Sequence, residues 1–189
     1  MKIRLRLVAV LSLIILPCLL LTGCGGSEKA ADAYIKKGDE IRAEIDEKSE
    51  RLAERMESMF KTLYDGLSSS MQLDRSGFDR DLAKVKALAA GMIGDAGEAR
   101  KAYARVAALS GVPVHQEYAN LGIEIIDSNA ASLEQLIAFL DECANRMSAK
   151  SFDVYAFQSY VSEFGNSLEV QGDKTGQLQL KAEKLKEKL

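Results

Sequence analysis

The sequence predicts an all-α protein, folded as an elongated antiparallel four-helix bundle with up-down topology. Apolar residues recur at spacings of three or four over four long segments, and turn-forming residues separate these segments. No alternating run is long enough to indicate a strand. At about 1.5 Å rise per residue, each segment would form a helix roughly 50 Å long. A three-helix bundle with one broken segment is the alternative.

The first helix is expected over residues 27–64, where one face carries Ile41, Ile45, Ser49, Leu52, Met56, Met59 and Leu63. Asp65 and Gly66 end it. The second helix is expected to start with Ser76 as its N-cap. Its apolar face carries Phe78, Leu82, Val85, Ala89, Met92, Ala96, Ala99, Tyr103 and Val106.

Gly111 is expected to cap the second helix, and Pro113 to begin the third, over residues 113–147. The face of the third helix that follows the helical repeat carries Tyr118, Leu121, Ile125, Asn129, Leu133, Leu136, Leu140 and Ala144. The fourth helix is expected over 154–189 because its spacing of three and four is unbroken. Helix-interior glycines make the second and fourth helices the ones most prone to kinks, at Gly91, Gly94, Gly97, Gly172 and Gly176.

The N-terminal region has the pattern of an export signal. Lys2, Arg4 and Arg6 precede a mostly apolar run of about 15 residues, which is shorter than the roughly 20 that a spanning helix needs. The run ends in Leu21-Thr22-Gly23-Cys24, which resembles the lipobox of bacterial lipoproteins, with small residues before the cysteine.

This resemblance implies that residues 1–23 are a cleaved signal peptide and that Cys24 receives a diacylglyceryl group, anchoring the protein in a lipid bilayer. Residues 24–26 would then form a lipid tether, and 27–189 a single helical-bundle domain. Such an anchor is stable because it carries two or three acyl chains. The resemblance also implies an extracytoplasmic location. Gly25 after the cysteine favours the outer membrane in a diderm cell, and a monoderm cell would carry the protein on the outer face of its membrane.

Composition excludes several other classes. Loss of the three basic residues of the signal leaves 22 basic residues against 28 acidic ones, a net charge of −6. A nucleic-acid partner is therefore not expected, because that affinity comes chiefly from basic side chains. With Cys24 lipidated, only Cys143 keeps a thiol in the mature chain, so no internal disulfide is expected.

No catalytic residue, metal site or cofactor other than the lipid is expected, and hence no enzyme. His115 is the only histidine, and it lies 28 residues from Cys143 on one predicted helix, or about 42 Å away. We expect His115 to be a solvated turn residue and Cys143 to be a small buried side chain. Acidic residues of the first helix alternate with basic ones, as is typical of exposed surface: Asp39, Glu40, Glu44, Asp46 and Glu47.

Polar and small residues interrupt the apolar faces near mid-bundle. The candidates for a pocket or a polar layer are Ser49, Met92, Asn129, Gln171 and Thr175. Such residues could line a ligand cavity between helices. Alternatively, they could fix the register of the helices and permit close packing.

Aromatic residues cluster at the predicted tip, opposite Cys24. The candidates for an exposed interaction patch are Phe60, Tyr64, Met71, Phe152 and Tyr155. They could equally cap the end of the core. At the other end, Lys181, Lys184, Lys186 and Lys188 could contact anionic headgroups, or form a solvated helix end that complements the helix dipole.

The functional expectation is a structural or protein-interaction role in the cell envelope, with an envelope protein or a second copy as partner. The alternative is a small-molecule-binding module with a mid-bundle pocket.

Overall fold

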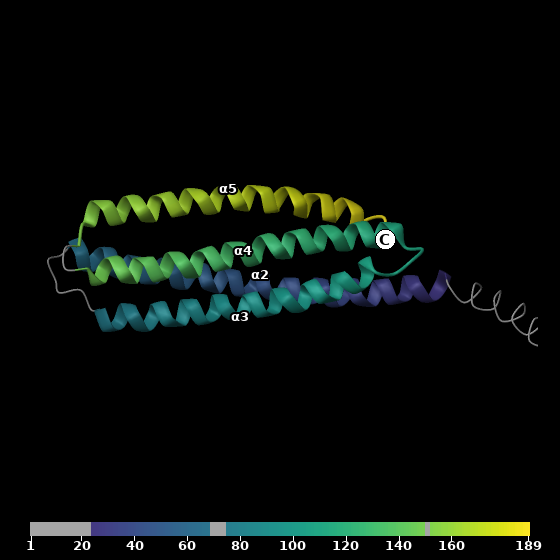
Figure 1. Cartoon of the computed structure of the whole chain (residues 1–189), viewed down its shortest axis with the longest axis horizontal. Coiled ribbons are helices and arrows are strands. Elements are labelled where there is room, and N and C mark those ends of the chain that lie inside the picture. The colour runs from purple at the N-terminus through teal and green to yellow at the C-terminus, as the bar shows by residue number, and fades with distance from the viewer. Residues whose placement is uncertain (1–23, 69–74, 150–151) are drawn as a thin grey trace, which may run out of the picture.

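The computed structural model describes residues 24–68, 75–149 and 152–189, and four long helices fill almost all of this part of the chain. Figure 1 shows them side by side along one long axis, with α5 at the edge of the molecule next to α4. The helices are α2 (Cys24–Ser68), α3 (Arg75–Ala107), α4 (Pro113–Ser148) and α5 (Val154–Lys186). Up-down packing of four helices confirms the predicted all-α four-helix bundle.

Helix boundaries differ from the predicted ones by a few residues. α2 continues to Ser68, so the prediction that Asp65 and Gly66 end it is wrong. α3 begins at Arg75, so Ser76 lies inside the helix and is not its N-cap. α2 begins at Cys24, so the expected tether at residues 24–26 is the first part of the helix. α3 and α5 are continuous helices despite their interior glycines. A Cβ atom at Gly91, Gly94 or Gly97 would meet no neighbouring atom within 4 Å, so these glycines are not sites of close helix packing.

The turn between α3 and α4 contains Gly111 and Pro113 as predicted, but α3 ends at Ala107, so Gly111 is a residue of the turn and not the cap of that helix. Gly111 has φ of +81°, a left-handed conformation that glycine adopts at little cost, and Pro113 opens α4. Gln116 donates from Nε2 to the carbonyl oxygens of Ala107 and Leu109, 3.1 and 2.6 Å away. This side chain satisfies carbonyls left without partners at the end of α3.

The core lies mainly between α2, α3 and α4. α3 packs extensively on both α2 and α4, whereas α5 packs mainly on α4 and over a smaller area. Small side chains of α3 let its neighbours approach, and larger residues fill the layers between them. The largest fully buried side chains are Tyr103, Tyr118, Phe157, Ile45, Leu63, Met92, Ile125, Ile126, Leu140, Val85, Val106 and Cys143.

The start of α2, the α3–α4 turn and the C-terminus lie at the same end of the molecule. A shallow hollow at this end is lined by Glu28, Asp32, Pro113, His115 and Leu189, among others. α2 extends beyond the other helices here (Figure 1). Among the described helices, none is both long enough and apolar enough to cross a membrane.

Candidate functional site: a polar cluster shared by four helices

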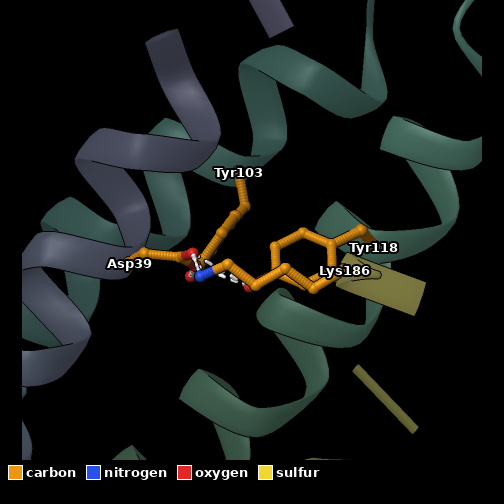
Figure 2. A network of polar contacts seen from close by, with 4 residues as sticks. All are labelled: Asp39, Tyr103, Tyr118 and Lys186. Carbon is orange, nitrogen blue, oxygen red and sulfur yellow. Dashed lines mark hydrogen bonds and ion pairs between the residues drawn. The ribbon is translucent and has the colours of Figure 1, made fainter. Parts of the chain in front are cut away.

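One residue from each helix contributes to a polar cluster in the half of the bundle that contains the start of α2. We call Asp39, Tyr103, Tyr118 and Lys186 the polar cluster (Figure 2). Asp39 Oδ1 accepts hydrogen bonds from the hydroxyls of Tyr103 and Tyr118, 2.6 and 2.8 Å away. Asp39 Oδ2 accepts from Lys186 Nζ at 2.5 Å and from Tyr118 at 3.0 Å. A single carboxylate therefore connects all four helices.

Two glycines make room for the ring of Tyr103. A Cβ atom at Gly38 of α2 would lie 2.7 Å from this ring, and one at Gly122 of α4 would lie 2.9 Å from it. Both distances are too short for real carbon contacts, so only glycine fits on either side. Tyr103 is fully buried as a result, and its hydroxyl reaches the Asp39 side chain next to Gly38.

The protonation states of the polar cluster follow from burial and hydrogen bonding. Burial alone would raise the pKa of Asp39, but hydrogen bonds from Lys186, Tyr103 and Tyr118 outweigh it and hold the pKa below the ordinary value. Burial, reinforced by the Asp39 charge, raises the pKa of both tyrosines well above the usual range. At neutral pH Asp39 is therefore a carboxylate, and Tyr103 and Tyr118 are neutral phenols.

This arrangement is better suited to holding helices together than to acid–base chemistry. Both Asp39 oxygens are occupied by donors, and neither tyrosine ionises near neutral pH. Arg42, one turn further along α2, is half-buried and lies within electrostatic range of the cluster. Its Nη1 is buried and has no hydrogen-bond partner among the described residues. Within the polar cluster itself, both Asp39 oxygens have donors, and a hydrogen-bonded network of this kind favours one register of the helices over others.

The prediction that Asp39 lies on an exposed helix surface is wrong, because its side chain is only 16% exposed. The neighbouring acids Glu40, Glu44, Asp46 and Glu47 are exposed as predicted. Two signals in the sequence point to the cluster. Buried tyrosines need a hydrogen-bond partner, and Tyr103 and Tyr118 both lie on predicted core faces. The second and weaker signal is that Gly38 and Gly122 interrupt helices far from any turn; Gly91, Gly94 and Gly97 do the same and are open, so an interior glycine does not by itself indicate close packing.

The mid-bundle candidates are divided between different environments. Met92 is buried in the core, Asn129 is half-buried, and Ser49 is exposed and donates to the Ile45 carbonyl. Gln171 and Thr175 both lie on the face of α5 that packs on α4.

Three side-chain hydrogen bonds join Gln171 and Thr175 to α4. Thr175 Oγ1 lies 2.8 Å from Ser128 Oγ. Gln171 Oε1 accepts from Ser132 at 2.8 Å, and its Nε2 donates to Gln135 at 3.0 Å. We call Ser128, Ser132, Gln135, Gln171 and Thr175 the polar seam.

The candidates for the tip patch also differ in how exposed they are. Phe60 is half-buried, with its ring centroid 6.1 Å from that of Phe139, and Phe152 is half-buried against Phe157 at 5.4 Å. Tyr155 is 84% exposed. Met71 lies outside the described residues, as does the side chain of Tyr64.

The two remaining candidates for reactive side chains, His115 and Cys143, lie in different environments. His115 is only 13% exposed rather than solvated, and its Nε2 lies 3.1 Å from Asp32. Cys143 is completely buried as predicted, and burial raises the pKa of its thiol to about 12. In the part of the chain that the structure describes, no group of three or more His, Cys, Asp or Glu side chains could hold a metal ion.

No protein-family model matches the chain, and comparisons with curated proteins and with solved structures likewise find no significant match.

Proposed function

We propose that this protein is a lipid-anchored bundle of the cell envelope that acts by binding or supporting another envelope component. The observation that carries the proposal is the sequence Leu21-Thr22-Gly23-Cys24, which ends where α2 begins. The lipid on Cys24 would be attached to the first residue of a rigid helix. The bundle would then be held close to the bilayer surface, on the outer membrane of a diderm cell or on the outer face of a monoderm membrane.

The dimensions of the bundle support a role as a support or spacer. α2 contains 45 residues, which at about 1.5 Å per residue gives a helix roughly 65 Å long. The C-terminus and the α3–α4 turn lie at the end that would carry the anchor, and the end of α4 and the start of α5 lie at the far end (Figure 1). The far end would therefore stand roughly 60 to 70 Å from the anchor.

The outer surface of α5 supports a protein-binding role. Large apolar side chains in the described structure are most exposed on this helix, where Tyr155, Val170 and Leu180 are 84, 71 and 59% exposed. Interfaces are enriched in tyrosine and other aromatic residues. The polar cluster and the buried Cys143 offer structural rather than reactive groups, which also favours binding over catalysis.

Photo-crosslinking in intact cells tests this proposal. A photoreactive residue at Val170 or Tyr155 reports on the outer surface of α5, and one at exposed Glu98 on α3 is the matched control. We expect discrete adducts from the α5 positions, fewer from Glu98, and loss of the α5 adducts in Cys24→Ala. Equal, diffuse labelling from all positions, or adducts unchanged by Cys24→Ala, would contradict the proposal.

A further inference from the structure

α5 is attached to the bundle much less firmly than the other helices. Its buried residues are only Phe157, Thr175 and Ala182, whereas ten residues of the similarly long α4 are buried. α5 packs mainly on α4, while α3 lies between two helices and packs extensively on both. Hydrophobic stabilisation scales with the apolar area removed from water. α5 therefore receives the smallest share of the hydrophobic stabilisation of the bundle.

The contact between α4 and α5 is also more polar than the rest of the core. In its middle, the polar seam replaces apolar packing with hydrogen bonds. Water can replace these bonds when the helices separate, so the net free energy that each contributes is much smaller than the strength of the bond itself. Firm apolar contact is concentrated toward the far end, where the Phe139 ring stacks on Phe164 with centroids 3.9 Å apart.

The other end of α5 is held by one ion pair, next to the small buried side chain of Ala182 and the partly buried Leu185. Lys186 Nζ reaches Asp39 of α2 at 2.5 Å, and the lysine side chain is 56% exposed. Without Lys186, the Asp39 carboxylate keeps its hydrogen bonds from Tyr103 and Tyr118. The three residues that remain lie on α2, α3 and α4, so departure of α5 leaves no unsatisfied carboxylate in the core.

α5 also satisfies its own N-terminus. Asp153 Oδ1 accepts hydrogen bonds from the backbone amides of Tyr155 and Ala156, 2.9 and 3.1 Å away, and acts as the N-cap. Since this cap uses no residue of another helix, it persists when α5 moves. α5 is therefore a capped helix whose tertiary contacts can be lost together.

From these four observations we infer that α5 is a releasable helix. It separates from α4 as one unit while α2, α3 and α4 stay folded as a three-helix core. The Lys186–Asp39 ion pair is the latch that sets how often this happens. Release uncovers the face of α4 that carries Phe139, Ser132 and Gln135. It requires neither the lipid on Cys24 nor a partner, so it stands apart from the proposed function.

Hydrogen exchange of the full mature chain, followed by mass spectrometry, tests this inference. A helix detached from α4 is only marginally stable in water, so its backbone hydrogen bonds open while it is released. Amides in the middle of α5 are therefore expected to exchange at least about tenfold faster, relative to their intrinsic rates, than those in the middle of α3 and α4. Low concentrations of urea should change the α5 rates only slightly, because its opening exposes little surface. If the amides of α5 and α3 had the same protection from exchange and the same dependence on urea, the inference would be overturned.

The latch is tested with Lys186→Gln, and Lys184→Gln is the matched control because Lys184 is an exposed lysine in the same helical turn. Lys186→Gln should speed exchange in α5 by about threefold, the size expected for a partly exposed ion pair, and leave α3 unchanged. Lys184→Gln should leave both helices unchanged. Equal effects of the two variants on α5, or an equal effect of Lys186→Gln on α3 and α5, would show that Lys186 is no latch.

Discussion

At the scale of single residues, the most constrained position in the bundle is the ring of Tyr103. Gly38 and Gly122 flank this ring on two different helices, and its hydroxyl donates to Asp39. The ring cannot move away from one glycine without approaching the other. We therefore expect that a side-chain carbon added at either glycine destabilises the fold, in contrast to one added at Gly91, Gly94 or Gly97 of α3.

Gly122→Ala should destabilise the fold. The new Cβ would lie 2.9 Å from the Tyr103 ring, and overpacking of this kind typically costs about 1 to 3 kcal/mol. The better helix propensity of alanine offsets up to about 1 kcal/mol of that. Urea unfolding measures the difference. Gly94→Ala is the control, because a Cβ there meets nothing within 4 Å, and it should be neutral or stabilising. Equal stability of the two variants would show that the ring is not confined.

Asp39→Asn should change how stability depends on pH. The pKa of Asp39 is lowered in the folded protein: burial raises it, but hydrogen bonds from Lys186 and the two tyrosines prevail. A lowered pKa contributes stability above the unfolded-state value, near 4, and this contribution is lost as pH falls through the folded-state value. The wild type should therefore be more stable than Asp39→Asn at pH 7, and the gap should narrow below about pH 4. Urea titrations from pH 7 to pH 2.5 test this, and a gap independent of pH would contradict it.

At the scale of elements, α2, α3 and α4 form the stable part of the bundle and α5 is attached to one side of it. α3 supplies small buried residues such as Ala89, Ala96 and Ala99, which let its neighbours approach closely. α5 instead meets α4 through the polar seam and the aromatic stack. The polar seam joins the middle of α5 to α4, and the apolar contact includes the stack of Phe164 on Phe139 and the buried side chains of Phe157 and Ala182.

A double-mutant cycle on Ser128→Ala and Thr175→Val should reveal a coupling between the two helices. The two hydroxyls are 2.8 Å apart and half-buried or buried. A hydrogen bond of this kind contributes about 0.5 to 1.5 kcal/mol, so the single changes should cost more in sum than the double change. Thermal or urea unfolding of the four proteins gives the coupling energy. Additive effects would mean that the polar seam does not join α4 to α5.

At the scale of the whole molecule, the sequence predicts the helices and their order because each apolar face follows the helical repeat closely. The turn around Gly111 is readable because glycine and proline interrupt that repeat, whereas the same kind of signal at Asp65 and Gly66 was wrong, since α2 continues to Ser68. The shallow packing of α5, compared with that of the other helices, was not predictable. A spacing of three and four indicates which face of a helix is covered, but not how much of that face is buried. The faces of α4 and α5 have similar spacing and very different burial.

The polar cluster was only partly predictable. Tyr103 and Tyr118 lie on predicted core faces, but the identity of their acceptor depends on which helices meet and at what height. Asp39 lies among other acids of α2 that are exposed, and nothing in its neighbours along the chain distinguishes it. Lys186 is one of several lysines near the C-terminus, and its pairing with a residue 147 positions away is a consequence of the fold.

For the whole molecule, we propose that the mature chain begins at Cys24 and carries lipid there. The most direct test is the intact mass of the protein extracted with detergent from its native membranes. We expect a chain of residues 24–189 with added diacylglycerol on Cys24, and in Cys24→Ala an unlipidated chain that keeps residues 1–23. A wild-type chain that keeps residues 1–23, or one that begins elsewhere without lipid, would contradict the claim.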